Sequence, residues 1–134
     1  MTVGMVIVSH SARLAEGVAE LAGQMVHGKV RIVAAGGLAD GVLGTSVDKI
    51  FDALCQVNSA DGILVLLDLG SAVMSAEMAV EAFAQESPHP VIISPAPLVE
   101  GAVIAAVEAS IGNSLEDVAE AAASAGSLPK IHSH

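Results

Sequence analysis

One histidine stands where its ring could do chemistry. His10 follows the apolar segment 4–8 and lies between Ser9 and Ser11, just before a helical pattern begins. The end of a buried strand holds a side chain firmly while leaving it open to solvent. An imidazole there can act as a general base, a metal ligand or a nucleophile that carries phosphate. Choosing among these roles largely decides the function of the chain.

Asp68 and the residues after it could complete a site around His10. Asp68 directly follows a second apolar run, 63–67. A carboxylate that reaches His10 can accept a hydrogen bond from one ring nitrogen and leave the other nitrogen with its lone pair toward solvent. Gly70 and Ser71 then open a predicted helix, whose free amides and positive dipole end favour an anion. A glycine-rich segment, 36–46, leads into another helix.

Each part also has an ordinary structural role. His10 alone could be a loop or capping residue, and Asp68 could simply cap the helix that follows it. The segment 36–46 matches neither Gly-x-Gly-x-x-Gly nor the phosphate-binding loop with its lysine. Because all three are expected at one edge of a sheet, their conjunction favours a functional site.

Other residues that often do chemistry are predicted to be structural. The segment 70–72 lacks the Gly-x-Ser-x-Gly elbow of serine hydrolases. No metal site is expected, because the remaining histidines show no metal-ligand spacing: His27, His89, His132 and His134. Core positions are predicted for the methionines Met25, Met74 and Met78, and Cys55 is predicted to be a buried, reduced thiol.

Composition and length favour one soluble domain in the cytoplasm. Of 134 residues, 53% are hydrophobic and 15% charged, so a sizeable core is available. The net charge of −10 argues against nucleic acid or an anionic membrane as partner and suits a partner with a basic face. We see no signal-peptide pattern and no apolar run near the roughly 20 residues that span a bilayer.

Four apolar runs predict a parallel sheet. The runs span residues 3–8, 31–34, 62–67 and 91–94. In each, apolar residues follow one another without alternating with polar ones, as is typical of strands covered on both faces. With helices between them, they predict an open four-stranded parallel sheet in the order 2-1-3-4, with helices on both faces. Ligand sites in such sheets lie where the winding reverses, outside the carboxyl ends of the strands. His10 and Asp68 would meet there.

Helical patterns fill the gaps between the predicted strands. One apolar stripe comprises Leu14, Val18, Leu21 and Met25, and another, after a turn at 95–97, comprises Val99, Val103, Ile104 and Val107. Further helices are expected at 47–54, with Thr45 or Ser46 as N-cap, at 71–83 and at 115–125. We expect a domain over residues 1–126 and a flexible tail over 127–134.

Several segments resemble the phosphotransfer subunits of bacterial phosphoenolpyruvate-dependent dihydroxyacetone kinases, which belong to the mannose-type IIA components of the sugar phosphotransferase system. The resemblance is close over roughly residues 1–85. Its most specific part is the pair VIVSHS and LLDLGSA; the matching stretches are 4–11, 14–18, 34–37, 44–46 and 61–73, with Glu77.

The resemblance implies a phosphotransferase subunit without a cofactor. His10 would take a phosphoryl group from the histidine-phosphocarrier protein and pass it to ADP on the nucleotide-binding kinase subunit. Asp68 would orient the ring, and the phosphoryl oxygens would contact Gly37, Ser71, Ser11 and Thr45. Family members are homodimers. We predict phosphorylation at Nε2, because the Asp68 contact would occupy Nδ1.

Two other functions remain open at this point. A mannose-type IIA component of a sugar transporter would use the same histidine with a different acceptor. A non-enzymatic module would bind a small anion at the same edge without forming a covalent bond.

Overall fold

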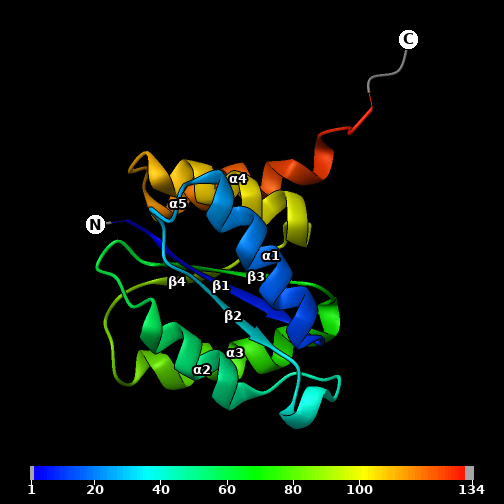
Figure 1. Cartoon of the computed structure of the whole chain (residues 1–134). Coiled ribbons are helices and arrows are strands. Elements are labelled where there is room, and N and C mark those ends of the chain that lie inside the picture. Colours follow the sequence, from blue (N-terminus) through cyan, green and yellow to red (C-terminus); the bar gives the residue numbers. More distant parts are fainter. Residues whose placement is uncertain (1, 132–134) are drawn as a thin grey trace.

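The sheet has the predicted topology. The computed structural model describes residues 2–131. Four parallel strands lie in the order β2-β1-β3-β4 (Figure 1): β1 Gly4–Ser9, β2 Ile32–Gly36, β3 Ile63–Leu67 and β4 Val91–Ile93. The two most apolar strands occupy the centre, as expected, and every residue of β1 is buried.

Helices cover both faces of the sheet (Figure 1). Three helices form the layer on one face: α1 Ala12–Met25, α4 Leu98–Ser110 and α5 Leu115–Ser124. They pack on the sheet through a core of small and branched apolar residues. Two helices form the opposite layer: α2 Val47–Gln56 and α3 Val73–Ala84. They enclose a second core that contains Phe83. Both faces of the central strands are therefore shielded from water, which explains why these strands read as continuous apolar runs.

Serine caps fix where three helices begin. The hydroxyl oxygens of Ser11, Ser46 and Ser114 accept the backbone amides of Leu14, Lys49 and Asp117. Such a cap contributes on the order of 1 kcal/mol. Because Ser11 caps α1, the helix begins at Ala12 and holds His10 in the short connection from β1.

The apolar stripe predicted for α1 is not its buried face. Val18 is buried, but Leu14, Leu21 and Met25 are 43–55% exposed. The helix instead packs through Ala15, Val18 and Ala22. Small side chains let the helix axis approach the sheet closely, so the larger residues are displaced to the flank.

The face predicted for α4 is also wrong, for the same reason. Val99 and Val107 are exposed, whereas Gly101 and four alanines of the helix are buried. α4 contacts both α1 and α5, so bulky residues do not fit on its inner face. A Cβ on Gly101 would lie 2.7 Å from the Ala96 Cβ.

Four residues predicted to be buried lie on the surface instead. Met25, Met74 and Met78 are 55%, 74% and 57% exposed, and Cys55 is exposed on α2. The buried positions of α2 are Ile50, Ala53 and Leu54. Partial desolvation at this exposed position, together with the carboxylates of Glu86 and Asp52, raises the pKa of the Cys55 thiol.

Part of the predicted tail contacts the domain. A short 3₁₀ turn over Ala125–Ser127 follows α5, and Lys130 Nζ lies 2.6 Å from Glu100 Oε2 on α4. Residues 132–134, with His132 and His134, lie outside the described residues.

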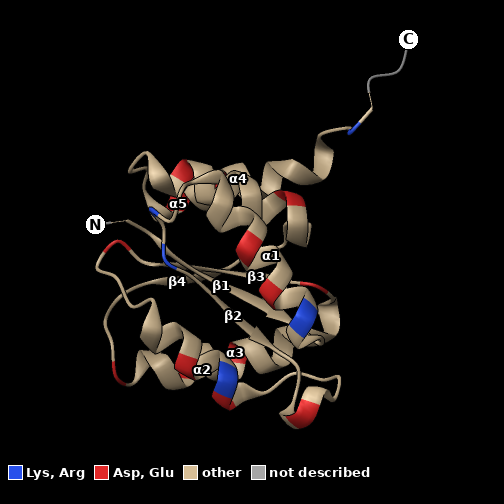
Figure 2. Cartoon of the chain, viewed as in Figure 1, with Lys and Arg blue, Asp and Glu red and all other residues tan. Residues whose placement is uncertain are grey.

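Acidic side chains dominate the charged surface. Figure 2 shows Asp and Glu on helices of both layers, with few Lys and Arg among them. Within residues 2–131, none of the helices combines the length and the hydrophobicity that crossing a bilayer takes.

Candidate functional site

The pairing of β1 with β3 brings His10 and Asp68 together. Val8 lies opposite Leu67 in the parallel register, and the Asp68 amide continues the ladder by donating to Val8 O. The His10 ring then places Nδ1 3.0 Å from Asp68 Oδ1 and 3.3 Å from Oδ2. The contact predicted between the ends of strands 1 and 3 is therefore present.

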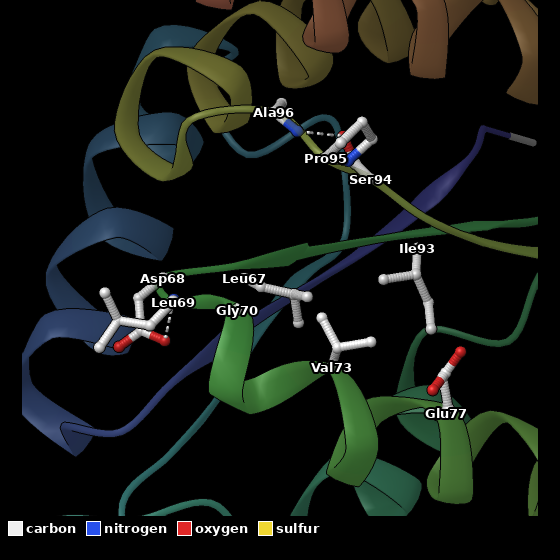
Figure 3. Close-up of a pocket in the computed structure, with 10 residues that line it drawn as sticks. All are labelled: Leu67, Asp68, Leu69, Gly70, Val73, Glu77, Ile93, Ser94, Pro95 and Ala96. Carbon is white, nitrogen blue, oxygen red and sulfur yellow. Dashed lines mark hydrogen bonds between the residues drawn. The ribbon is translucent and has the colours of Figure 1, made fainter.

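The Asp68 carboxylate accepts hydrogen bonds at both oxygens. Oδ2 accepts from Ser9 Oγ and from the His10 amide, each at 2.9 Å. Oδ1 accepts from the Leu69 amide at 2.7 Å, the bond that is dashed in Figure 3. Burial alone would raise the pKa of Asp68, but the hydrogen bonds from His10, Ser9 and Leu69 outweigh it and lower that pKa below its ordinary value. The Asp68 carboxylate is therefore an anion, and it can only accept hydrogen bonds.

The anionic partner fixes the tautomer of His10. Because Asp68 can only accept, the ring nitrogen that faces it, Nδ1, carries the proton. In the neutral ring Nε2 then has the lone pair, and Ser71 Oγ lies 3.0 Å from it. The His10 side chain is 27% exposed. A nucleophilic nitrogen is thus held in a defined direction at an open position.

The residues around Ser71 form a tight turn ahead of α3. We expected an α-helix from Ser71, but Gly70–Ala72 is a 3₁₀ turn and α3 begins at Val73. In the described part of the chain, the amides of Gly70 and Ser71 have no acceptor, whereas Ala72 N donates to Leu69 O. Free donors therefore lie beside the hydroxyl that contacts Nε2.

The glycine-rich loop supports the His10 backbone instead of offering free amides. The Gly37 amide donates to Ser9 O at 3.1 Å, and the Gly44 amide donates to His10 O at 2.8 Å. Gly37 has φ +69°, which favours glycine, and a Cβ there would lie 3.1 Å from the Ala12 amide. The Gly37 amide thus already has a protein acceptor, and the phosphoryl contact expected at Gly37 stays a prediction.

The other two expected phosphoryl contacts also have protein partners. Ser11 Oγ accepts the Leu14 amide at 3.2 Å, and Thr45 Oγ1 lies 2.7 Å from Ser75 Oγ on α3. Each hydroxyl retains further hydrogen-bonding capacity. Of the four expected residues, Ser71 is the one with a hydrogen bond to the His10 ring among the described residues.

Three supporting residues were given no role by the sequence interpretation, although it named Ser9 beside His10. Ser9, fully buried, donates to Asp68 and accepts the Ser11 amide at 3.0 Å. Lys49 Nζ binds the loop carbonyls Gly36 O and Leu38 O. Ser75 lies one helical turn from Ser71, a spacing that was readable from the sequence. Over residues 2–131, no three His, Cys, Asp or Glu side chains gather as a metal site requires.

Comparisons with known proteins show the family of this chain. The family model of PTS system fructose IIA components (EIIA-man) matches residues 4–119. The phosphoryl donor subunit DhaM of the PEP-dependent dihydroxyacetone kinase of Escherichia coli (strain K12) is 44% identical, over 87% of this chain but 25% of that protein. The chain thus spans about a quarter of that relative.

Two further similar proteins match along nearly their whole length. DhaM of the PEP-dependent dihydroxyacetone kinase 2 of Listeria innocua is 39% identical, covering 87% of this chain and 93% of that protein. The crystal structure of EF1359, a protein of unknown function, has a TM-score of 0.78 and 33% identity, covering 92% and 94% of the two chains.

Proposed function

This chain belongs to the phosphotransferase-system family of fructose IIA components, among the DhaM phosphoryl donor subunits, and from that premise we propose that it is a phosphotransferase subunit that carries a phosphoryl group on His10. The observation that carries the proposal is the orientation of the ring. Asp68 holds Nδ1 and leaves the lone pair of Nε2 at an open position beside Ser71.

The transfer needs no proton movement at His10. The Nε2 lone pair attacks phosphorus on the donor, an N–P bond forms at His10, and the donor's N–P bond breaks with its electron pair returning to the donor imidazole. The phosphorylated ring keeps its Nδ1 proton and becomes a cation. Asp68, at 3.0 Å, balances that charge. Catalysis is then a matter of position and electrostatics.

Hydrogen-bond donors beside Nε2 would hold the phosphoryl oxygens. The Ser71 hydroxyl lies 3.0 Å from Nε2, and the amides of Gly70 and Ser71 belong to the same turn. The hydroxyls of Ser11 and Thr45 are proposed as outer contacts. Such donors stabilise charge on a transferring group because they are already oriented before the reaction.

We propose the histidine-phosphocarrier protein as donor and ADP, bound on the nucleotide-binding subunit of dihydroxyacetone kinase, as acceptor. In the second step an oxygen of the ADP β-phosphate attacks phosphorus, a P–O bond forms, and the His10 N–P bond breaks to restore the neutral ring. The names of the relatives support this branch. Residues 1–126 would act as the transfer domain, in the cytoplasm.

A sugar-transporting IIA component is the second candidate, because the matching family model is described by fructose. The acceptor separates the two functions. With phosphoenolpyruvate, the general transferase and the phosphocarrier present, the chain should acquire an acid-labile phosphate. Adding the kinase subunits, ADP and dihydroxyacetone should then release it and yield dihydroxyacetone phosphate. A phosphoprotein that keeps its phosphate under those conditions would contradict the kinase branch.

We also propose that the chain forms a homodimer. α4 is mostly apolar, with Glu100 and Glu108 as its charged residues, and Val99, Val107 and Ile111 remain 41–69% exposed. A helix of that composition is normally covered. Because each chain carries a net charge of −10, two copies would associate through such a mostly apolar face. Analytical ultracentrifugation should give twice the monomer mass, and Val107→Lys should reduce it to the monomer mass.

A further inference from the structure

A cavity lies beside the His10 site, at the carboxyl ends of β3 and β4. It has a volume of about 380 Å³. Figure 3 shows it between the end of β3, the first two turns of α3 and the connection that follows β4. Asp68 and Leu69 form the end nearest His10, so the cavity adjoins the reacting ring without containing it.

The walls of the cavity are mostly apolar, and the charged side chains that line it are carboxylates. Leu67, Val73 and Ile93 line it, and Glu77 stands at the opposite end from Asp68 (Figure 3). The Asp68 carboxylate is already engaged by His10, Ser9 and Leu69. Glu77 is exposed and is therefore the carboxylate free to bind a cation. No lysine or arginine is among the lining residues, so a phosphate or nucleotide would be repelled here.

Exposed apolar side chains continue the surface outside the cavity. Leu69 is 60% exposed at its edge, and Met74 and Met78 are 74% and 57% exposed on the adjacent face of α3. Exposed apolar groups gathered beside a reactive residue are typical of a protein-binding surface. Methionine suits such a surface because its flexible side chain adapts to the partner.

We propose that this cavity receives a segment of the protein that phosphorylates His10. The segment would insert one apolar side chain against Val73 and Ile93 and place a lysine or arginine on Glu77. The positive charge must come from the partner, because the chain carries −10 and the arriving phosphoryl group is itself anionic. This inference rests on the proposed function and names the chemistry of its donor.

The test compares two phosphoryl donors. Glu77→Gln removes the charge and keeps the shape of the side chain. With the phosphorylated histidine-phosphocarrier protein as donor, KM should rise about threefold to tenfold with little change in kcat, as expected for loss of a rim ion pair. With phosphoramidate, a small donor that needs no docking, the rate of His10 phosphorylation should stay the same. Glu120→Gln, an exposed charge on α5, should change neither reaction.

A second variant tests the apolar part of the cavity. Val73→Phe should fill it and raise the same KM without altering the phosphoramidate reaction. An unchanged KM in Glu77→Gln, a loss of phosphoramidate reactivity in that variant, or a rise in KM only for the kinase subunit would each overturn the inference. A wild-type chain that takes phosphate from neither donor would instead remove the proposed function, and the inference with it.

Discussion

His10 Nδ1 and Asp68 Oδ1 lie 3.0 Å apart, although 58 positions separate the two residues in the chain. The parallel pairing of β1 with β3 brings about this contact, because Val8 pairs with Leu67, Asp68 directly follows Leu67, and His10 lies two residues after Val8. The consequence is chemical. One ring nitrogen is bound to an anion, and in the neutral ring the other nitrogen keeps its lone pair, as the proposed nucleophile requires.

Replacing Asp68 with asparagine should slow phosphorylation on the order of 100-fold, since an orienting carboxylate both fixes the tautomer and balances the cationic ring. The initial rate of phosphate incorporation, with the phosphocarrier or with phosphoramidate, measures this loss. Asp61→Asn is the matched control, because Asp61 is exposed near the opposite end of β3. Equal rates in wild type and Asp68→Asn would remove Asp68 from the mechanism.

Asp68 should also make stability depend on pH in the acid range. Its pKa is lowered in the folded state, so the anion stabilises the fold above the unfolded value of about 3.9. That contribution is lost as pH falls through the folded pKa. Urea unfolding between neutral and acid pH should show a steeper loss of stability in wild type than in Asp68→Asn. Parallel curves for the two proteins would contradict the hydrogen-bonded anion.

Ser71→Ala should reduce the phosphorylation rate roughly tenfold, the effect of one lost hydrogen bond to the reacting group. The Asp68 contact is untouched by this change, so the orientation of the ring should persist. Ser124→Ala on α5 removes an equivalent exposed hydroxyl away from the site and should have no effect. If the two serine variants react equally fast, Ser71 does not contact the phosphoryl group.

Gly36 is needed for the close approach of β2 to the start of α1. A Cβ there would lie 2.5 Å from Ser11 O and 2.8 Å from the Ala15 Cβ. Gly36→Ala should therefore destabilise the fold by about 1–3 kcal/mol. Gly17→Ala, in α1 with no atom near the added methyl, should stabilise it by roughly 0.5–1 kcal/mol. Denaturant unfolding compares the two, and effects of the same sign would contradict the packing described.

The sheet and the central contact could be predicted from the sequence, because long apolar runs are unambiguous and parallel strands meet at one edge. His10 and Asp68 each follow such a run. The helix faces could not. In α1 and α4 the buried surface is formed mainly by alanine and glycine. The bulky apolar residues, from which the buried face was predicted, lie at the exposed flank of each helix. Hydrophobicity can be read from the sequence, but where helices pack closely the size of a side chain decides whether it fits at the contact.

The hydrogen-bond acceptors of individual backbone amides could not be predicted from the sequence either. Gly37 lies in a glycine-rich loop at the expected edge, but its amide is occupied by Ser9 O. Only the course of the backbone decides whether such a donor faces a ligand or a neighbouring carbonyl. The sequence placed Ser9 beside His10 but assigned it no role, because a lone serine at the end of an apolar run carries no motif; it is fully buried and supports Asp68.

The most direct test of the central claim is the site of phosphorylation on His10. Protein labelled with ¹⁵N-histidine and charged from phosphoenolpyruvate should show phosphorus–nitrogen coupling at Nε2 of His10, and none in His10→Ala. Coupling at Nδ1, or a phosphate that persists in His10→Ala, would contradict a nucleophile oriented by Asp68.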